Sequence, residues 1–401
     1  MISPRLIIPG KLGLLLLSLA GLSNFALAGN GPDSGSNTNS VGTNNVARAP
    51  SKLFDPHDGW PDASGFLDTA YGFVPLAMPI TEPAVGYGAT VGFVFIDRKE
   101  QQPGEAFQKP NMTAVGGMGT ENGSWAVLAG HSGSWFDGCL ETLVGAGYGK
   151  INLDFYGIGD GALNGQPVGY ELEPLGGIVE GRYRLGKSPA RIGLGYTIAS
   201  TQVSFDDSAL PPPVENLELD SRVAGLTPKL IHDSRNTLFT PTRGTYGEVN
   251  CGLFREVLGG NYDFELVSLA LIQYLPLSPR LTLGVKAEGS FSFGDAPFYM
   301  RPFINLRGAA IRRYVGEHVA NVEGEVRWQF WRRFSLVGFG GTGIAWNDFD
   351  RFQSEQTIIT GGTGVRYELA RRHDLHMGID VAFGPDDPAI YIQFGSAWFR
   401  P

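Results

Sequence analysis

The sequence predicts an all-β protein: a transmembrane antiparallel β-barrel of 16 strands with a long loop folded into its lumen. Three observations support this fold class. Most of the chain alternates between apolar and polar residues, an export signal precedes the alternating part, and no run of 18 apolar residues follows the first thirty positions. A chain with many two-faced strands and no helical span can cross a membrane only as a closed sheet.

The N-terminal region predicts export and three segments ahead of the barrel. Residues 1–28 carry Arg5 and Lys11, then a short leucine-rich stretch, then Ala26-Leu-Ala28, which are the parts of a cleaved signal peptide. Residues 29–65 are rich in Gly, Asn and Ser and predict a flexible leader. Residues 66–84 are apolar and interrupted by prolines, which predicts an extended periplasmic lead-in, with the barrel over 85–401.

The alternation itself can be read from the parity of the residue numbers. In 281–293 the apolar residues occupy odd positions, such as Leu283 and Val285, and polar residues such as Lys286 occupy even ones. In 320–330 the parity is reversed, with Val322 apolar and Glu323 polar. Strands with one apolar and one polar face also occur in soluble sandwiches, but here ionisable residues recur on one face only. We therefore expect the apolar face to contact lipid and the polar face to line the lumen.

The turns between the runs give a strand count. Fifteen candidate strands lie near 85–97, 110–119, 124–134, 139–155, 166–186, 189–205, 221–235, 244–257, 261–275, 280–293, 318–332, 333–346, 356–369, 374–384 and 388–399. A barrel whose two ends both lie in the periplasm needs an even number. One strand is therefore hidden, either in 166–186 or in the lead-in near 70–80, and sixteen fits best.

Composition excludes several functions. The net charge of −9 without basic clusters argues against nucleic acid as a partner. No nucleophile motif or phosphate-binding loop is present, so we expect neither an enzyme nor a cofactor. His373 and His376 lie across a turn into a strand, which disfavours a metal site. The lipid-facing parity of Cys251 favours two free thiols over a disulfide with Cys139.

Several segments resemble the bacterial surface-antigen superfamily, the barrels of the BamA and TamA type. The turn Asp233-Ser-Arg235-Asn-Thr-Leu-Phe-Thr-Pro241-Thr242-Arg243-Gly244 is similar to a turn motif of that family, and Arg307-Gly308 in the long connection 294–317 resembles its loop motif. Four further segments also resemble parts of proteins of this superfamily: residues 79–88, 323–328, 337–343 and 384–399. The resemblance covers roughly 79–400 and implies that the 294–317 loop folds into the barrel.

The resemblance also implies how the loop is held. In the family an arginine of the loop pairs with an acid of a Phe-x-Asp-x-Gly strand motif, and here Phe339 and Gly343 match while Gly341 replaces the acid. The parity of the strands leaves Glu323, Glu325 and Asp380 as candidate partners for Arg307. A guanidinium among carboxylates in a partly desolvated lumen would latch the loop. The alternative is that Arg301, Arg307, Arg312 and Arg313 line an anion-passing constriction.

A second departure concerns the periplasmic domains of the family. Residues 29–84 leave no room for a folded polypeptide-transport-associated (POTRA) domain, so the chain resembles a branch without them. The resemblance implies a Gram-negative outer-membrane protein that inserts proteins into that membrane, or passes protein or lipid across it, through a weak seam between 85–97 and 388–399. Glycines Gly86, Gly88 and Gly92 would weaken that pairing. The expected partners are outer-membrane lipid and client polypeptides or a separate periplasmic protein. The alternative is a passive channel or a structural barrel.

Overall fold

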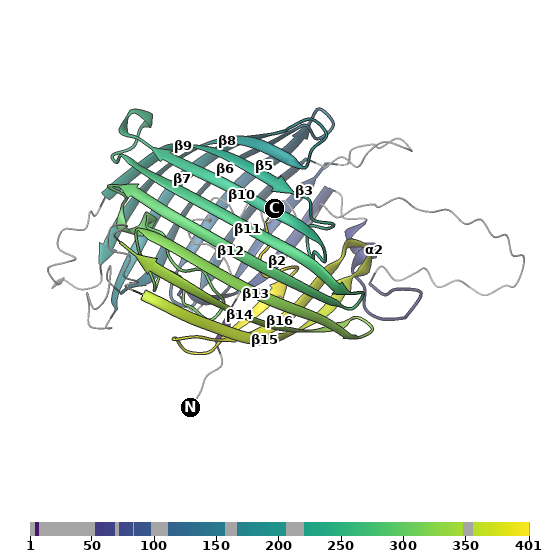
Figure 1. The fold of residues 1–401 in the computed structure, drawn as a ribbon. Coiled ribbons are helices and arrows are strands. Elements are labelled where there is room, and N and C mark those ends of the chain that lie inside the picture. Colours follow the sequence, from purple (N-terminus) through teal and green to yellow (C-terminus); the bar gives the residue numbers. More distant parts are fainter. Residues whose placement is uncertain are drawn as a thin grey trace, which may run out of the picture.

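The computed structural model describes residues 53–68, 72–82, 84–97, 111–156, 167–205, 220–347 and 356–400, together with the backbone of Arg5–Ile7. Strands β2 to β17 form one antiparallel sheet that closes into a tilted barrel of 16 strands (Figure 1). The predicted fold class is confirmed. No helix in the described segments is long and apolar enough to span a bilayer.

The elements follow one another with short turns or long loops between them. The strands are β1 (Arg5–Ile7), β2 (Gly72–Glu82), β3 (Gly86–Ile96), β4 (Met112–Thr120), β5 (Trp125–Trp135), β6 (Leu140–Phe155), β7 (Val168–Arg184), β8 (Ala190–Phe205), β9 (Asp220–Asp233), β10 (Gly244–Phe254), β11 (Phe264–Ser278), β12 (Leu281–Gly294), β13 (His318–Trp331), β14 (Phe334–Trp346), β15 (Gln356–Ala370), β16 (Leu375–Phe383) and β17 (Ala389–Phe394). The helical pieces are α2 (Ser64–Leu67), η2 (Glu256–Leu258), η3 (Phe298–Met300) and η4 (Arg371–His373).

An even number of strands places the start of β2 and the end of β17 at the same end of the barrel, which we call the terminal rim. The β9–β10, β13–β14 and β15–β16 turns also lie at the terminal rim, because every second turn returns to it. The opposite end, the loop rim, carries the long β12–β13 connection that contains Arg307.

The faces of β12 to β16 follow the predicted parity. On β13, Val322 is 48% exposed on the outside, whereas the neighbouring Glu323 is 1% exposed on the inside. Exposed Val326 and Trp328 alternate in the same way with buried Glu325 and Arg327. Apolar side chains thus face outward to lipid and the charged ones face the lumen, as a membrane barrel requires.

The hidden strand is β2, which confirms the second of the two predicted places, the stretch near 70–80. The prediction that 66–84 is a lead-in and that the barrel begins at residue 85 is therefore wrong. β2 pairs along its whole length with β3, from Gly72 opposite Ile96 to Glu82 opposite Gly86. Pro75 and Pro79 lie within it. Proline removes a ladder hydrogen bond and is tolerated in edge strands, and β2 has a full ladder on one side only.

The inner face of β2 to β5 is the second departure from expectation. Val74, Val94, Ile96, Met112 and Leu128 form a buried apolar cluster there with Ala114. Their neighbours along the same strands, Phe73, Phe93, Phe95, Val115 and Val127, are exposed on the outside. These strands are therefore apolar on both faces, and the expectation of a polar lumen wall fails for this part of the barrel. An inner wall covered by its own side chains has no need of polar groups.

The junction between β2 and β17 differs from the other strand junctions. Among the described residues, each consecutive pair from β2 to β17 has a residue-by-residue register, whereas β2 and β17 are neighbours without one. We call this junction the seam. It was predicted between 85–97 and 388–399, but Gly86, Gly88 and Gly92 lie in β3, which pairs on both sides. The short β1 runs parallel to β17 at the seam.

Residues 53–68 adopt a defined structure against the terminal rim, so the predicted flexible leader 29–65 is too long at its C-terminal end. The segment contains α2 and a bridge between Phe54 and Pro61. Its hydrogen bonds to β15 and to the turn after it provide the order that local composition does not. The predicted signal peptide apart from β1, and leader residues 29–52, lie outside the described residues.

Candidate functional site

The candidate site is the loop of residues 295–317, which folds from the loop rim into the lumen and packs on β13 to β17. Ile304 and Leu306 of the loop are buried against β14. A Cβ atom at Gly343 would lie 2.4 Å from Ile304 Cγ2, and one at Gly341 would lie 2.7 Å from a backbone oxygen and 3.1 Å from Leu306 Cδ2. Glycine at the position of the family acid therefore makes room for the loop to pack directly on the wall.

Arg307 is the centre of the site and is 4% exposed. Its Nε donates to Glu323 Oε1 at 2.7 Å. Its Nη1 donates to Asp380 Oδ2 at 2.9 Å and lies 2.8 Å from Glu325 Oε2. The guanidinium carbon lies 3.6 Å from the ring centroid of Phe339, so the ring covers one face of the cation. The structure thus brings all three candidate acids to one arginine.

The electrostatics of Arg307 follow from this arrangement. Burial alone would lower its pKa, but the charges of Glu323, Glu325 and Asp380 outweigh burial and raise it above the ordinary value. The group therefore stays cationic throughout the physiological range. Buried ion pairs of this kind hold their partners in one arrangement. Removing one partner leaves the charges of the others buried and uncompensated.

The residue after the arginine joins the loop to the last strand. Gly308 N–H donates to the hydroxyl of Tyr391 on β17 at 2.8 Å. Gly308 has φ +93°, and a Cβ there would lie 2.8 Å from Phe383 O, so only glycine fits without strain. The loop motif therefore touches the β17 side of the seam.

Asp386, in the β16–β17 turn, holds the tip of the loop. Its carboxylate accepts hydrogen bonds at 2.9 Å from Ala310 N and from the Tyr314 hydroxyl, and it lies 2.9 Å from Arg313 Nη1. The sequence motifs did not identify this aspartate as part of the site. The one signal in the sequence for its role was its position, because it is an acid in the loop-rim turn directly before the last strand.

Further side chains hold two of the three acids, Asp380 and Glu323, in place. Arg366 on β15 donates to Asp380, with Nη2 2.8 Å from Oδ2. Trp398 Nε1 donates to Glu323 Oε2 at 2.6 Å, and Lys286 Nζ lies 3.6 Å from the same oxygen. Arg366, Lys286 and Trp398 were missed in the sequence, because no local motif marks them.

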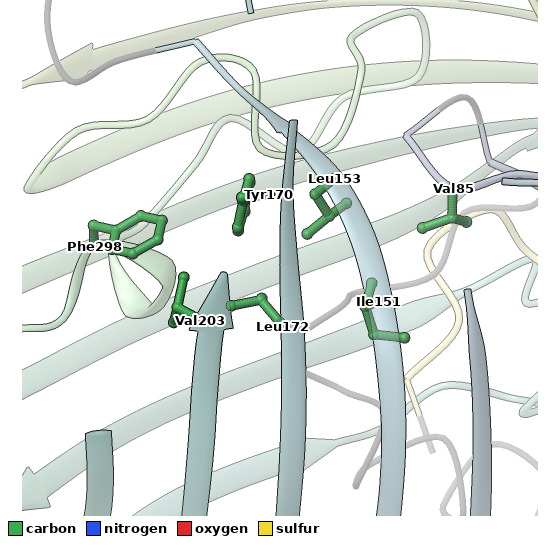
Figure 2. Packing of buried hydrophobic residues seen from close by; sticks show 7 residues of the cluster. All are labelled: Val85, Ile151, Leu153, Tyr170, Leu172, Val203 and Phe298. Atoms are coloured by element: carbon green, nitrogen blue, oxygen red, sulfur yellow. The ribbon is translucent and has the colours of Figure 1, made fainter. Parts of the chain in front are cut away.

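The first part of the loop packs into an apolar cluster at the loop rim. Figure 2 shows Phe298 of η3 facing Tyr170, Leu172 and Val203 on β7 and β8. The Phe298 ring lies 5.5 Å from that of Tyr170 and 6.1 Å from that of Phe205. The loop is thus held by charges on one wall and by aromatic packing on the other.

The four loop arginines do not form a ring of free charges. Arg312 is buried and donates to Phe298 O at 3.0 Å, and Arg313 is paired with Asp386. Arg301 lies 3.5 Å from Glu317. This arrangement favours a latched loop over a constriction lined by Arg301, Arg307, Arg312 and Arg313.

The family turn motif lies at the terminal rim, away from Arg307. Arg235 forms a two-armed pair with Asp233, at 2.8 Å for both contacts. Pro241 O accepts a hydrogen bond from Arg327 on β13 at 2.9 Å, so the turn contacts a strand three places along the sheet from β10. The backbone N–H groups of Thr242 and Arg243 each donate to one amide oxygen, Asn236 Oδ1, at 3.0 Å.

Gly244 and the C-terminal segment complete this end of the barrel. Gly244 has φ +102°, and a Cβ there would lie 2.3 Å from Ser234 O. After β17, Ser396 N donates to Phe239 O at 2.6 Å, and Arg235 Nη2 donates to Arg400 O at 2.7 Å. Because the same segment carries Trp398 to Glu323, it connects the turn motif with the arginine latch.

The remaining candidates stand apart from this site. His373 Nε2 lies 2.9 Å from Asp68, and His376 N donates to Thr240. The described residues contain no cluster of metal-ligand side chains. Cys139 and Cys251 are both free.

Comparison with known proteins rests on structure, since no family model and no curated protein matches the sequence. CdiB from Escherichia coli superposes with a TM-score of 0.57 and 12% identity, over 80% of this chain and 62% of that one. BamA from Haemophilus ducreyi lacking POTRA domains 1–3 gives 0.51 and 12%, over 81% and 69%, and CdiB from Acinetobacter baumannii gives 0.51 and 12%, over 79% and 56%. The chain thus spans between about half and two thirds of the length of these neighbours. Its fold is that of the BamA and CdiB barrels, which supports a place in the outer membrane of a Gram-negative bacterium.

Proposed function

We propose that the protein is an outer-membrane machine without a catalytic step that inserts polypeptides into the membrane, or passes polypeptide or lipid across it, by parting the seam between β2 and β17. The terminal rim faces the periplasm, since outer-membrane barrels keep both ends there. The seam is the observation that carries the proposal, because it is the one strand junction of the described sheet without a register.

The composition of β2 supports the proposal. Its two prolines, Pro75 and Pro79, each lack a backbone donor. β17 has only six residues, against eleven in β2, so much of the edge of β2 has no strand of matching length beside it. Unpaired edges in a bilayer are costly, and an edge retained there is one that can accept another strand.

The arginine latch supports an active rather than a passive role for β17. The loop holds the β16–β17 hairpin from within through Asp380, Asp386 and Tyr391. One side of the seam is therefore anchored to a buried charge cluster, and β2 has no such anchor among the described contacts of Arg307.

We further propose that the chain is exported by a signal peptide cleaved after Ala28. Cleavage would remove β1 and leave the edge of β17 at the seam without its parallel neighbour. The N-terminal residue of the protein isolated from membranes tests this: we expect Gly29, and a chain that begins at Met1 would contradict it.

A passive channel, the alternative function, would need an open path for solutes through the lumen. In the described residues the loop occupies the lumen between the charged wall and the Phe298 cluster, which does not suit free solute passage. A structural barrel would not need an unregistered seam.

The test is a seam locked by a disulfide. In a chain with Cys139→Ser and Cys251→Ser, Ala77→Cys on β2 is combined with Ile390→Cys on β17. Both residues are on the lipid side of their strands by parity. The matched control joins two strands that are paired along their length, β14 and β15. It uses Leu336→Cys and Val365→Cys, which lie opposite each other on these strands.

The readout is the outer-membrane proteome of cells depleted of the native protein and supplied with each variant. We expect the locked seam to leave other outer-membrane proteins depleted until reductant is added, and the control lock to restore them. Full rescue by the oxidised, locked seam would overturn the proposal. A depletion phenotype restricted to small-solute permeability would identify a channel instead.

A further inference from the structure

Residues 53–68 are held on the terminal rim by backbone and side-chain groups at the end of β15 and in the turn after it. Ala63 N donates to Leu369 O at 2.7 Å, and the Tyr367 hydroxyl donates to Pro61 O at 2.6 Å, both at the end of β15. Arg372 N donates to Ser64 Oγ at 3.2 Å. Backbone and side-chain contacts of this density specify one position for the segment.

Arg333, in the β13–β14 turn, is the centre of this contact and is 0% exposed. Its Nη2 lies 2.6 Å from Asp55 Oδ2 and its Nε 2.8 Å from Asp58 Oδ2. Its Nη1 lies 2.7 Å from Asp62 Oδ2. Three carboxylates from eight consecutive residues thus surround one guanidinium, and Arg371 of the next turn lies 3.4 Å from Asp55 and 3.3 Å from Asp58 on the outside.

The C-terminal end and the middle of the segment are fixed by other contacts. Asp68 Oδ1 lies 2.9 Å from His373 Nε2, and its other oxygen contacts Arg372. Trp60 packs edge-on against Trp331, with ring centroids 5.5 Å apart, and against Phe334 at 5.8 Å. The charges fix the position, and the aromatic rings cover the side toward the barrel surface.

The segment of residues 53–68 connects the two sides of the seam. It directly precedes β2, which is one side of the seam, but it binds the turns of β13 to β16, which lie on the other side beyond β17. The chain therefore crosses beneath the seam at the terminal rim. Asp68 and Gly72 are four residues apart, so the chain between them spans at most about 14 Å.

This reach can be compared with the width of the sheet. Neighbouring strands are about 4.8 Å apart, so β2 and β16, with β17 between them, are separated by roughly 10 Å. One further strand inserted at this end of the seam would raise the separation to about 14 Å, the full reach of the tether. A wider opening at the terminal rim requires release of Asp68 and then of the Arg333 cluster.

We propose that residues 53–68 are an ionic clasp that limits separation of β2 from β17 at the terminal rim, so that the seam parts first at the loop rim. The inference rests on the proposed function for its biological meaning. Its structural content, a restrained terminal end and a freer loop end, can be measured without any client.

The experiment measures distances across the seam by pulsed dipolar electron paramagnetic resonance on the purified full chain in lipid bilayers. All chains carry Cys139→Ser and Cys251→Ser. One pair of nitroxide labels, at Phe95→Cys and Met377→Cys, reports the terminal end on β3 and β16, and a second pair, at Ala89→Cys and Phe383→Cys, reports the loop end. All four label sites are exposed on the lipid side.

The variant combines Arg333→Gln with Asp68→Asn, which weakens both anchors of the segment, and the matched control is Arg332→Gln in the same turn as Arg333, whose side chain is exposed and is not part of the cluster. We expect the double variant to lengthen or broaden the terminal-end distance by about one strand spacing, roughly 5 Å. The Arg332→Gln distances should match those of the parent. In the parent, the loop-end distribution should be broader than the terminal-end one.

A second variant keeps the proposal falsifiable if the first does not fold. Asp58→Asn and Asp62→Asn combined with Asp68→Asn remove three acids from the segment and leave the barrel sequence intact, and this variant should give the same terminal-end change. An unchanged terminal-end distance in a folded variant of either kind overturns the clasp, whatever happens to other outer-membrane proteins. A longer distance with an unchanged outer-membrane proteome supports the clasp and counts against the proposed insertion role.

Discussion

Replacement of Arg307 by alanine tests the latch directly. The substitution leaves Glu323, Glu325 and Asp380 around an empty position, with side chains 1%, 10% and 0% exposed. Breaking a buried pair by removing one partner costs about 3–5 kcal/mol. Because Arg366 still neutralises Asp380, we expect the lower end, about 3 kcal/mol.

This magnitude predicts a large change in the position of the loop. Each 1.36 kcal/mol is a factor of ten, so about 3 kcal/mol raises the population of the undocked loop by roughly 100-fold. In planar bilayers we expect Arg307→Ala to open more often and with higher conductance than the parent. Arg307→Lys keeps the charge but loses the planar two-armed geometry, and it should fall between the two.

The matched control is Arg313→Ala in the same loop. Its side chain is 38% exposed and its single acidic partner is Asp386, so the cost should be at most about 1 kcal/mol. Folding of each variant is checked by the mobility of the unheated barrel on gels. A folded Arg307→Ala barrel with the conductance of the parent would refute the latch.

Three further predictions follow from the structure. Gly343→Ala places a Cβ 2.4 Å from a loop side chain and should raise conductance in the same assay, whereas Gly338→Ala on the same strand, with nothing within 4 Å, should be silent. Gly244→Ala, at φ +102°, should destabilise the barrel by about 1–3 kcal/mol in urea unfolding, and an unchanged midpoint would contradict this. Hydrogen bonding to the clasp guanidinium lowers the pKa of Asp58; at Asp62 burial raises the pKa, but hydrogen bonds outweigh it and lower it. The clasp is thus stabilised above the ordinary pKa of 3.8 and lost below it, so terminal-end label distances should stay constant from pH 7 to 5 and lengthen only below about pH 3.8.

The strands were predictable because the signal for them is local. Alternation with period two is visible wherever one face is apolar and the other polar, as on β12 and β13, and the strand bounds there agree with the structure within a few residues. The stretch of β2 was only one of two candidates for the sixteenth strand, because it is apolar on both faces and contains prolines, so it shows neither alternation nor the usual composition of a strand. β17, its neighbour across the seam, has no residue-by-residue register with it, and that relation is not visible in the sequence of β2.

The candidate site was predictable only in part. Parity identified Glu323, Glu325 and Asp380 as inward-facing acids, and the resemblance identified Arg307. Asp386 contacts loop residues 72 to 76 positions away, and Arg333 contacts acids more than 270 positions away. Such pairs depend on how the barrel closes and which turns share a rim, and no local pattern encodes that.

The distribution of charge makes it easier for β2 than for β17 to move toward lipid. β2 has no charged side chain from Gly72 to Thr81, so under the proposed mechanism it can tilt toward lipid without exposing an ion to the bilayer. A charge moved to the lipid face at the bilayer midplane costs about 2–4 kcal/mol, and β2 avoids that cost. Movement of the β17 side costs more free energy, because β16 carries Asp380, which is bound to Arg307 and Arg366. Under the proposed mechanism β2 is therefore the side of the seam that moves. The clasp ahead of β2 acts as its hinge, and the latch keeps the β17 side fixed.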